Sequence, residues 1–144
     1  MNILFIADFF LRDGIRGGAE LVDDELTQLL SDAGMQVNMI NSHLVDEDMI
    51  SSQNFDALMV SNFVNLSHDI KELLAESHNY FIFEHDHKYL KSRNPSTYPN
   101  QEAPSSEITN ENFYKNAKAV FCQTGMHARL LMKNILLENV VNLT

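Results

Sequence analysis

Two adjacent glycines form the first pattern in the sequence that could serve a ligand. Residues 14–20 read GIRGGAE and lie between an apolar run and a helical pattern. Because Gly17 and Gly18 have no side chains, a ligand could approach their backbone closely. The free N–H groups and the positive dipole end of the following helix would suit a phosphate. A tight turn that requires glycine explains the same residues equally well, and the segment matches neither the dinucleotide-binding motif nor the P-loop.

The second pattern is the segment 84–89, EHDHKY. In an extended chain His85 and His87 would point to the same side, as two imidazoles of a metal site do. The segment places no third ligand, so we expect no metal, and solvated histidines at a polar strand end are the plain alternative. The functional alternative is sugar recognition, in which His85 bonds to a hydroxyl and Asp86 accepts others.

Cationic and aromatic residues lie at the end of this segment and directly after it. Lys88, Lys91 and Arg93 lie near Tyr89 and Tyr98 in the sequence. Aromatic rings suit the face of a sugar, and lysine and arginine suit an anionic group. A solvated loop tip would have the same composition, so both interpretations stay open.

The remaining candidates carry less chemistry. We expect Cys122 to lie inside a strand as a small hydrophobe, because no activating base is near it in the sequence. His127 falls in the first turn of an expected helix, where it could contact a phosphate. His43, His68 and His78 are expected on the surface or in turns.

Short apolar runs alternate with helical patterns along the chain, and these elements must position the residues above. Apolar runs predict strands at 3–7, 37–40, 56–61, 79–84, 118–123 and 139–143. Helical spacing and capping residues predict helices at 18–33, 67–77 and 124–137. In the first helix Val22, Leu26, Leu29, Leu30 and Ala33 share one face, Asp23 and other polar residues occupy the rest, and Gly34 is the stop.

This alternation predicts an α/β fold, a Rossmann-like three-layer domain with a mostly parallel six-stranded sheet and helices on both faces. The 144 residues fit one domain over 1–144. Sites in such domains lie beyond the carboxyl ends of the strands. One segment, from 85 to about 109, has no clear period and holds all three prolines, which indicates a functional loop or disorder.

Composition excludes several classes of partner. The chain has 20 acidic and 10 basic residues and a net charge of −10, so we expect no nucleic-acid partner. No apolar run is long enough to span a bilayer and the N-terminus does not read as a signal peptide, so we expect no stable membrane insertion. The single cysteine fits a reducing compartment and predicts a cytoplasmic protein.

In order along the chain, these segments resemble the N-terminal domain of the large retaining glycosyltransferase family 4. That family has the GT-B architecture, in which two Rossmann-like domains face each other across a cleft. The resemblance rests on Gly-Gly-Ala-Glu before a helix that ends in Ala-Gly-Met-Gln-Val, and on three later segments. These are 83–86 (FEHD), 117–124 (AKAVFCQT) and 139–143 (NVVNL).

The resemblance implies roles for particular residues. Gly17 and Gly18 would contact the donor diphosphate, and His85 is the candidate catalytic residue. A sugar or glycan acceptor would be bound by His85, Asp86, His87, Lys88, Tyr89 and Arg93. The substrate would be a nucleotide-sugar, with no cofactor. In that family a C-terminal domain holds most of the donor, and these 144 residues lack it, so we expect the chain alone to be inactive.

A free-standing flavodoxin-like binding or regulatory domain without catalysis is the alternative. Asp8 and the acidic first half of the chain suit a phospho-acceptor fold superficially. A response regulator would carry an aspartate after the third strand, where this sequence has Ser61-Asn62-Phe63.

Overall fold

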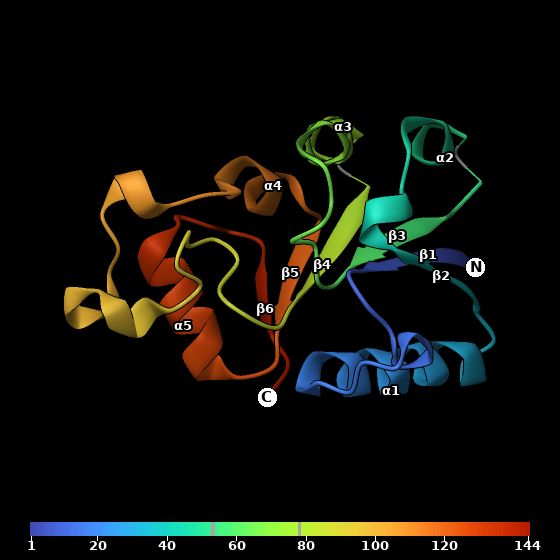
Figure 1. Cartoon of the computed structure of the whole chain (residues 1–144), viewed down its shortest axis with the longest axis horizontal. Coiled ribbons are helices and arrows are strands. Elements are labelled where there is room, and N and C mark those ends of the chain that lie inside the picture. Colours follow the sequence, from blue (N-terminus) through green and yellow to red (C-terminus); the bar gives the residue numbers. More distant parts are fainter. Residues whose placement is uncertain (53, 78) are drawn as a thin grey trace.

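A computed structural model describes residues 1–52, 54–77 and 79–144. His78, expected on the surface or in a turn, lies outside the described residues. The described chain forms one sheet of six strands, all parallel, in the order β2-β1-β3-β4-β5-β6 (Figure 1). The predicted α/β class and six-stranded sheet are therefore confirmed. The second strand is added on one side of β1, and all later strands are added on the other side, so the strand order reverses between β1 and β3. Open parallel sheets bind ligands at such a position.

All six predicted strands are present, and each end lies within one residue of its predicted position. They are β1 Asn2–Ala7, β2 Gln36–Asn41, β3 Ala57–Val60, β4 Tyr80–Glu84, β5 Ala119–Cys122 and β6 Val140–Asn142. The apolar runs mark them well because the strands of a covered parallel sheet are buried on both faces.

The described chain also contains five α-helices, of which the sequence predicts three. They are α1 Gly18–Asp32, α2 Glu47–Ser51, α3 His68–Ser77, α4 Glu111–Asn116 and α5 Gly125–Asn134. Helix α5 ends at Asn134, before the predicted Leu137. Helices α2 and α4 escape prediction because five or six residues are too few to show a helical period.

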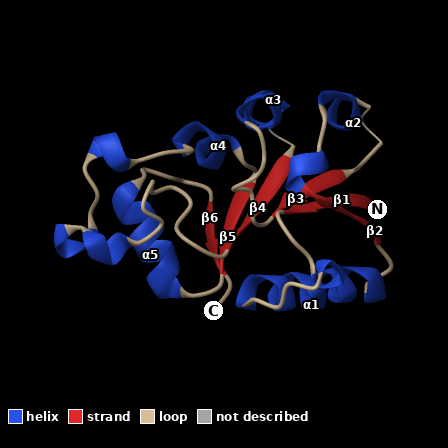
Figure 2. Ribbon diagram, in the orientation of Figure 1, coloured by secondary structure: helices blue, strands red, loops and turns tan. Residues whose placement is uncertain are grey.

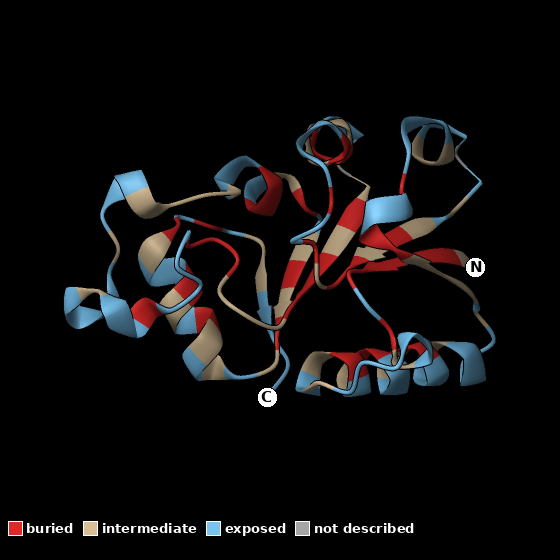
Figure 3. Ribbon diagram, viewed as in Figure 1, coloured by how far each residue is buried: buried red, intermediate tan, exposed pale blue. Residues whose placement is uncertain are grey.

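The helices form a layer on each side of the sheet (Figures 1 and 2). Helix α1 lies on one face, where Leu26 packs against Phe5, Ala7 and Phe10. Helices α3, α4 and α5 lie on the other face and join one core through Leu74, Phe113 and Leu131. Buried residues gather on the strands and on the helix sides that face them (Figure 3). This arrangement is the predicted three-layer domain.

The inward side of α1 differs from the predicted one. Its buried residues are Glu20, Asp23 and Thr27, whereas Leu29 is 59% exposed. The prediction that sets Asp23 apart from the packed face of the helix is wrong, since Asp23 is fully buried and bonds to Ser61 and His85. Hydrophobicity alone predicted the wrong inward face, because polar partners at the ends of the strands allow a carboxylate to be buried here.

Short turns and backbone contacts organise the segment between β4 and α4. Three 3₁₀ turns occupy Pro95–Thr97, Pro99–Gln101 and Ser105–Glu107. Leu90 forms an antiparallel bridge with Ile108, and both Tyr89 and Leu90 are buried. The segment is thus packed onto the domain, with its first residues directly beyond the carboxyl end of β4.

At the end of β4, the neighbouring side chains of Glu84 and His85 lie on opposite faces of the sheet. Glu84 lies on the side of α4 and α5, where it bonds to Tyr114. His85 lies on the side of α1, where it bonds to Asp23. No helix in the described part of the chain is long and apolar enough to cross a membrane.

Candidate functional site

A cavity of about 460 Å³ lies at the carboxyl edge of the sheet on the side of α1. The start of α1 and the segments after β3, β4 and β5 meet around it. Its lining residues are Gly18, Ala19, Val22, Asn62, His85, Asp86 and Gln123. The structure therefore brings the glycine segment and the histidine segment, which the sequence placed at this edge, to one cavity.

The two glycines at the start of α1 have different surroundings. Neither has a positive φ, and the Gly17 backbone is extended at φ −92° and ψ 174°. The N–H of Gly17 donates to Glu20 Oε2 at 2.9 Å, and a Cβ at Gly17 would collide with that carboxylate. A Cβ at Gly18 would meet no atom within 4 Å. A strained turn does not explain Gly18, and its side of the helix opens toward the cavity.

This geometry changes which backbone groups are free for a phosphate. The N–H of Gly17 already donates to the Glu20 carboxylate, so it is less able to donate to a phosphate than the sequence had led us to expect. The N–H groups of Gly18 and Ala19 come before the first intrahelical bond, which Leu21 makes to the carbonyl of Gly17. Gly18 and Ala19 are the residues whose N–H groups can face an anion here.

A chain of four polar side chains runs from the cavity lining, through His85 and Gln123, to the buried Asp23 and Ser61. The hydroxyl of Ser61 donates to Asp23, with both carboxylate oxygens at 2.7 Å. Asp23 Oδ1 also lies 2.8 Å from Nε2 of His85, and Nδ1 of His85 lies 3.0 Å from Nε2 of Gln123. The chain links α1 to the ends of β3, β4 and β5.

Asp23 sets the hydrogen position on the His85 ring. A carboxylate only accepts, so the N–H must lie on Nε2, and Nδ1 accepts from the amide of Gln123. The side chain of His85 is 6% exposed, and both its nitrogens are engaged. The expected bond from His85 to an acceptor hydroxyl therefore requires Gln123 to give up its place at Nδ1.

Asp86, Lys88 and Arg93 form an ion-pair network beside this cavity. Lys88 Nζ lies 2.5 Å from Asp86 Oδ1, and Arg93 lies 3.3 Å from Asp86 Oδ2. Burial alone would raise the pKa of Asp86, but the two cations more than offset it and lower that pKa. The side chain of Asp86 is 41% exposed, so it is the member of the network that a ligand in the cavity can reach.

Lys88 does not belong to the solvated loop tip that was one of its two interpretations. It is 3% exposed, and its ammonium bonds to Asn62 Oδ1 at 3.2 Å and lies 3.7 Å from Glu84 Oε1. Buried in this way, Lys88 holds the segments after β3 and β4 together and is not free to bind an acceptor directly.

A buried acid–base group lies on the opposite side of β4. Glu84 is fully buried, its Oε2 accepts from Tyr114 at 2.5 Å, and its Oε1 lies 3.8 Å from His127 Nε2. Burial raises the pKa of Glu84 and lowers that of His127 to about 4. Within the described ranges, Glu84 Oε1 and His127 Nε2 have no hydrogen-bond partner.

His85 and His87 do not share a side as the extended-chain argument predicted. His87 Nδ1 pairs with the hydroxyl of Tyr89 at 2.8 Å, and its ring packs on His127 with centroids 4.4 Å apart. The prediction fails because β4 ends at Glu84 and the chain turns there. In the part of the chain that the structure describes, no three His, Cys, Asp or Glu side chains are grouped to hold a metal ion.

Other predicted residues lie further from the cavity. Tyr89 is fully buried, so its ring cannot stack on a sugar. His127 faces Glu84 in the interior, which leaves it poorly placed for a phosphate. Cys122 is buried in β5 as expected, and burial raises its pKa to about 12, far from that of a nucleophilic thiolate.

Sequence reasoning missed three members of the polar chain. Ser61 and Gln123 each follow a strand directly, so the rule that sites gather at carboxyl ends could have found them. Asp23 carried no such signal, since a carboxylate in an acidic helix resembles a solvent-facing residue.

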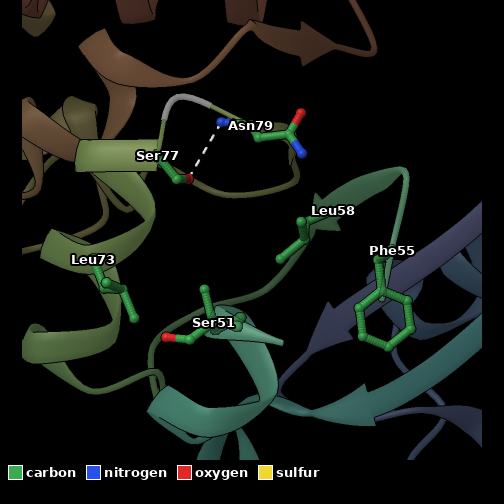
Figure 4. Close-up of a pocket in the computed structure, with 7 residues that line it drawn as sticks. Ser51, Phe55, Leu58, Leu73, Ser77 and Asn79 are labelled. Carbon is green, nitrogen blue, oxygen red and sulfur yellow. Dashed lines mark hydrogen bonds between the residues drawn. The ribbon is translucent and has the colours of Figure 1, made fainter. Parts of the chain in front are cut away.

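A larger cavity of about 560 Å³ opens at the other edge of the sheet, between α2 and α3 (Figure 4). Leu58, Leu73 and Phe55 supply apolar surface, and Ser51, Ser77 and Asn79 supply neutral polar groups. None of its described lining residues is charged. It lies at the amino ends of β3 and β4, away from the edge where parallel sheets bind ligands.

Comparisons of the chain with protein-family models, with curated proteins and with solved structures give no match.

Proposed function

We propose that this chain is the acceptor-binding and phosphate-contacting N-terminal domain of a nucleotide-sugar-dependent glycosyltransferase of the GT-B type. One observation carries the proposal. Polar groups from three strand ends and the side-chain-free start of a helix converge on a single cavity at the carboxyl edge. A hydroxyl-rich ligand and a phosphate are the two chemistries that such a lining serves.

The helix start supports the phosphate role. Backbone N–H groups of Gly18 and Ala19 would stabilise the negative charge that grows on a departing diphosphate, and the dipole of α1 has the matching sign. Because Gly18 has no side chain and its Cβ direction is open, a phosphate oxygen can approach the backbone closely.

The polar chain supports the acceptor role. Asp23 fixes the ring of His85, while Gln123 bonds to the nitrogen that faces the segment after β5. An acceptor hydroxyl would replace Gln123 at Nδ1, and the exposed carboxylate of Asp86 would accept from a second hydroxyl. In a complete GT-B enzyme a C-terminal domain would supply the contacts to the nucleotide and the donor sugar.

The strand order favours a second candidate, a flavodoxin-like binding domain without catalysis. The first five strands follow the order 2-1-3-4-5, which flavodoxin-like domains share. A phospho-acceptor version is disfavoured because Asp8 is 5% exposed and its oxygens accept from the hydroxyl of Ser42 and the N–H groups of Val64 and Asn65. The rival ligand would be a flavin mononucleotide.

Amide NMR of the 144-residue chain distinguishes the two candidates. Nucleotide-sugars with uridine, guanosine or adenosine should shift the amides of Gly18, Ala19 and Gln123, with weak affinity and no sugar transfer. Flavin mononucleotide should cause no such shift. Affinity in the micromolar range or tighter, about −8 kcal/mol, would contradict the two-domain architecture. Unmoved Gly18 and Ala19 amides at saturating nucleotide-sugar would refute the phosphate contact.

A further inference from the structure

A second cavity, of about 330 Å³, lies on the opposite side of Lys88 from the first. Its walls come from the segments after β3 and β4, from α3 and from the residues before α4. The residues that matter here are Phe63, Lys71, Lys88, Lys91, Arg93 and Asn110. Lys88 separates the two cavities, since it lines this one while it bonds to Asn62 and Asp86 of the other. We call the second one the basic cavity.

The lining of the basic cavity has a charge opposite to that of the protein. It contains four cationic side chains, Lys71, Lys88, Lys91 and Arg93, and none of its described lining residues is acidic. The whole chain has only 10 lysines and arginines against 20 acidic residues. Such a concentration of cations in one concave surface of an acidic protein creates a local attraction for anions.

Two of the four cations lack a carboxylate partner. Lys88 and Arg93 share Asp86. Lys71 Nζ bonds to the neutral Asn110 Oδ1 at 3.2 Å, and Lys91 Nζ donates to the carbonyl of Ser106. Within the described residues, neither Lys71 nor Lys91 forms an ion pair. These two ammonium groups are therefore available to an incoming anion.

Lys71 is a partly buried cation that packs on an aromatic ring. Its Nζ lies 5.4 Å from the centre of the Phe63 ring, and Nζ of Lys88 lies 5.1 Å from the centre of the same ring. Burial lowers the pKa of Lys71, and attraction from Asp8 offsets only part of that effect. Asp8 is itself bonded to Ser42 and to two backbone N–H groups, so it does not neutralise Lys71 fully. A cation whose pKa is lowered by burial, in a cleft and without an ion-pair partner among the described residues, is a candidate binding group.

The walls of the basic cavity are fixed before any ligand arrives. The carbonyl of Lys88 accepts from Asn110 Nδ2 at 2.8 Å, and the carbonyl of Tyr89 accepts from the N–H of Thr109 at 2.9 Å. The N–H of Lys91 donates to the carbonyl of Glu107 at 3.0 Å. A site whose backbone is held in this way loses little entropy when it binds.

We propose that the basic cavity binds an oxyanion, the phosphate or carboxylate of a small molecule, through the ammonium groups of Lys71 and Lys91. Arg93 adds a planar donor at the rim. Lys88 lies between the basic cavity and the part of the first cavity where the acceptor would bind. We therefore assign the anion as a charged group of the acceptor molecule. That last identification rests on the proposed function, whereas oxyanion binding itself does not.

Three probes of similar size and different charge test the basic cavity. Glucose 6-phosphate, glucuronate and glucose are titrated into the 144-residue chain, and amide NMR follows Leu90, Lys91 and Asn110. The charged probes should shift these amides at millimolar concentration and lose affinity as salt is raised. Glucose should not shift them. Binding of only one charged probe assigns the anion as phosphate or as carboxylate.

Charge-removing variants locate the contact. Lys71→Gln and Lys91→Gln should each weaken the binding of the charged probe about tenfold. Lys118→Gln removes the same charge from an exposed site at the other edge of the sheet, where Lys118 bonds to Asn79, and should leave the affinity unchanged. Lys91 is exposed, so its variant tests the proposal even if Lys71→Gln fails to fold.

Three results would overturn the proposal. These are binding of no charged probe, equal binding of glucose, and equal weakening by Lys118→Gln and Lys91→Gln. None of the probes is a nucleotide, and the amides observed differ from those of Gly18, Ala19 and Gln123. A negative result for oxyanion binding therefore does not decide whether nucleotide-sugars bind at the first cavity. A negative result with nucleotide-sugars likewise does not decide whether the basic cavity binds an oxyanion.

Discussion

The carboxylate of Asp23 on α1 lies 2.8 Å from Nε2 of His85, which directly follows β4. This contact joins segments 62 residues apart and orients the only histidine at the floor of the first cavity, within the described chain. In the proposed function Asp23 would be a positioning residue, because it would act on a ligand only through the ring of His85.

Asp23→Ala should destabilise the fold and release the His85 ring. Removal of the carboxylate leaves the Ser61 hydroxyl and Nε2 of His85 without their acceptor, at a cost of about 1–3 kcal/mol. Urea denaturation measures the loss, and ¹⁵N NMR of the histidine ring reports which nitrogen carries the hydrogen. The neighbouring Asp24→Ala removes the same charge from an exposed position and should change neither. An unchanged His85 tautomer in Asp23→Ala would contradict the positioning role.

Gly18→Ala should separate ligand binding from turn geometry. Gly18 has no positive φ and its Cβ would meet open space, so alanine should leave stability unchanged or slightly higher. The added methyl group should nevertheless block the nucleotide-sugar shifts of Ala19. Gly34→Ala is the contrasting variant, because φ is +83° there and alanine should cost about 1 kcal/mol. Thermal denaturation and amide NMR are measured together, and undiminished shifts in Gly18→Ala would count against the phosphate role.

Lys88→Met should be strongly destabilising. The ammonium is 3% exposed and serves Asp86, Asn62 and Glu84, so its removal leaves polar groups in the interior without a cation. Breaking one partner of a buried ion pair costs about 3–5 kcal/mol. Lys115→Met removes an exposed ion pair with Glu111 and should cost less than about 1 kcal/mol. Equal denaturation midpoints for the two variants would show that the network around Lys88 contributes little to stability.

His127→Gln should make the fold less sensitive to mild acid. Burial lowers the pKa of His127 from its ordinary 6.5 to about 4, so between these values the unfolded chain binds a proton that the native chain does not. Stability therefore falls as pH drops from about 6.5 to 4, and the variant removes that contribution.

The raised pKa of Glu84 acts in the opposite direction and is present in both proteins, so it cancels from the comparison of the His127 variant with the wild type. His87, whose pKa burial lowers, also stays in both. Denaturation midpoints across this pH range give the slopes. His68→Gln, at an exposed residue, is the control, and an equal slope for His127→Gln and wild type would refute the assignment.

The sheet was predictable because its physical cause is local in the sequence. A strand such as Ile3–Ala7 is buried on both faces and is therefore continuously apolar, and a helix start such as Thr124 shows its capping side chain. The short helices α2 and α4 were not found, since five or six residues show no helical period; α2 does carry a local signal, because the side chain of Asp46 caps it at the N–H of Met49.

The candidate site was predictable only in its location. Gly18, His85 and Asp86 lie at the expected edge, but the burial of Asp23 and Lys88 depends on partners that are distant in sequence. A lone carboxylate or ammonium is favoured in water, and only a particular set of opposite groups reverses that preference. No pattern along one segment contains this information.

The chain of side chains from Ser61 through Asp23 and His85 to Gln123 has a consequence for how the protein folds. Its three contacts span sequence separations of 38, 62 and 38 residues. Each closes a long loop, and contacts of that kind form late. During synthesis the chain cannot complete this set until Gln123 and the strand before it have emerged. The ring hydrogen of His85 is thus a reporter of finished folding, and its slow exchange with solvent would mark the moment at which this set of contacts is complete.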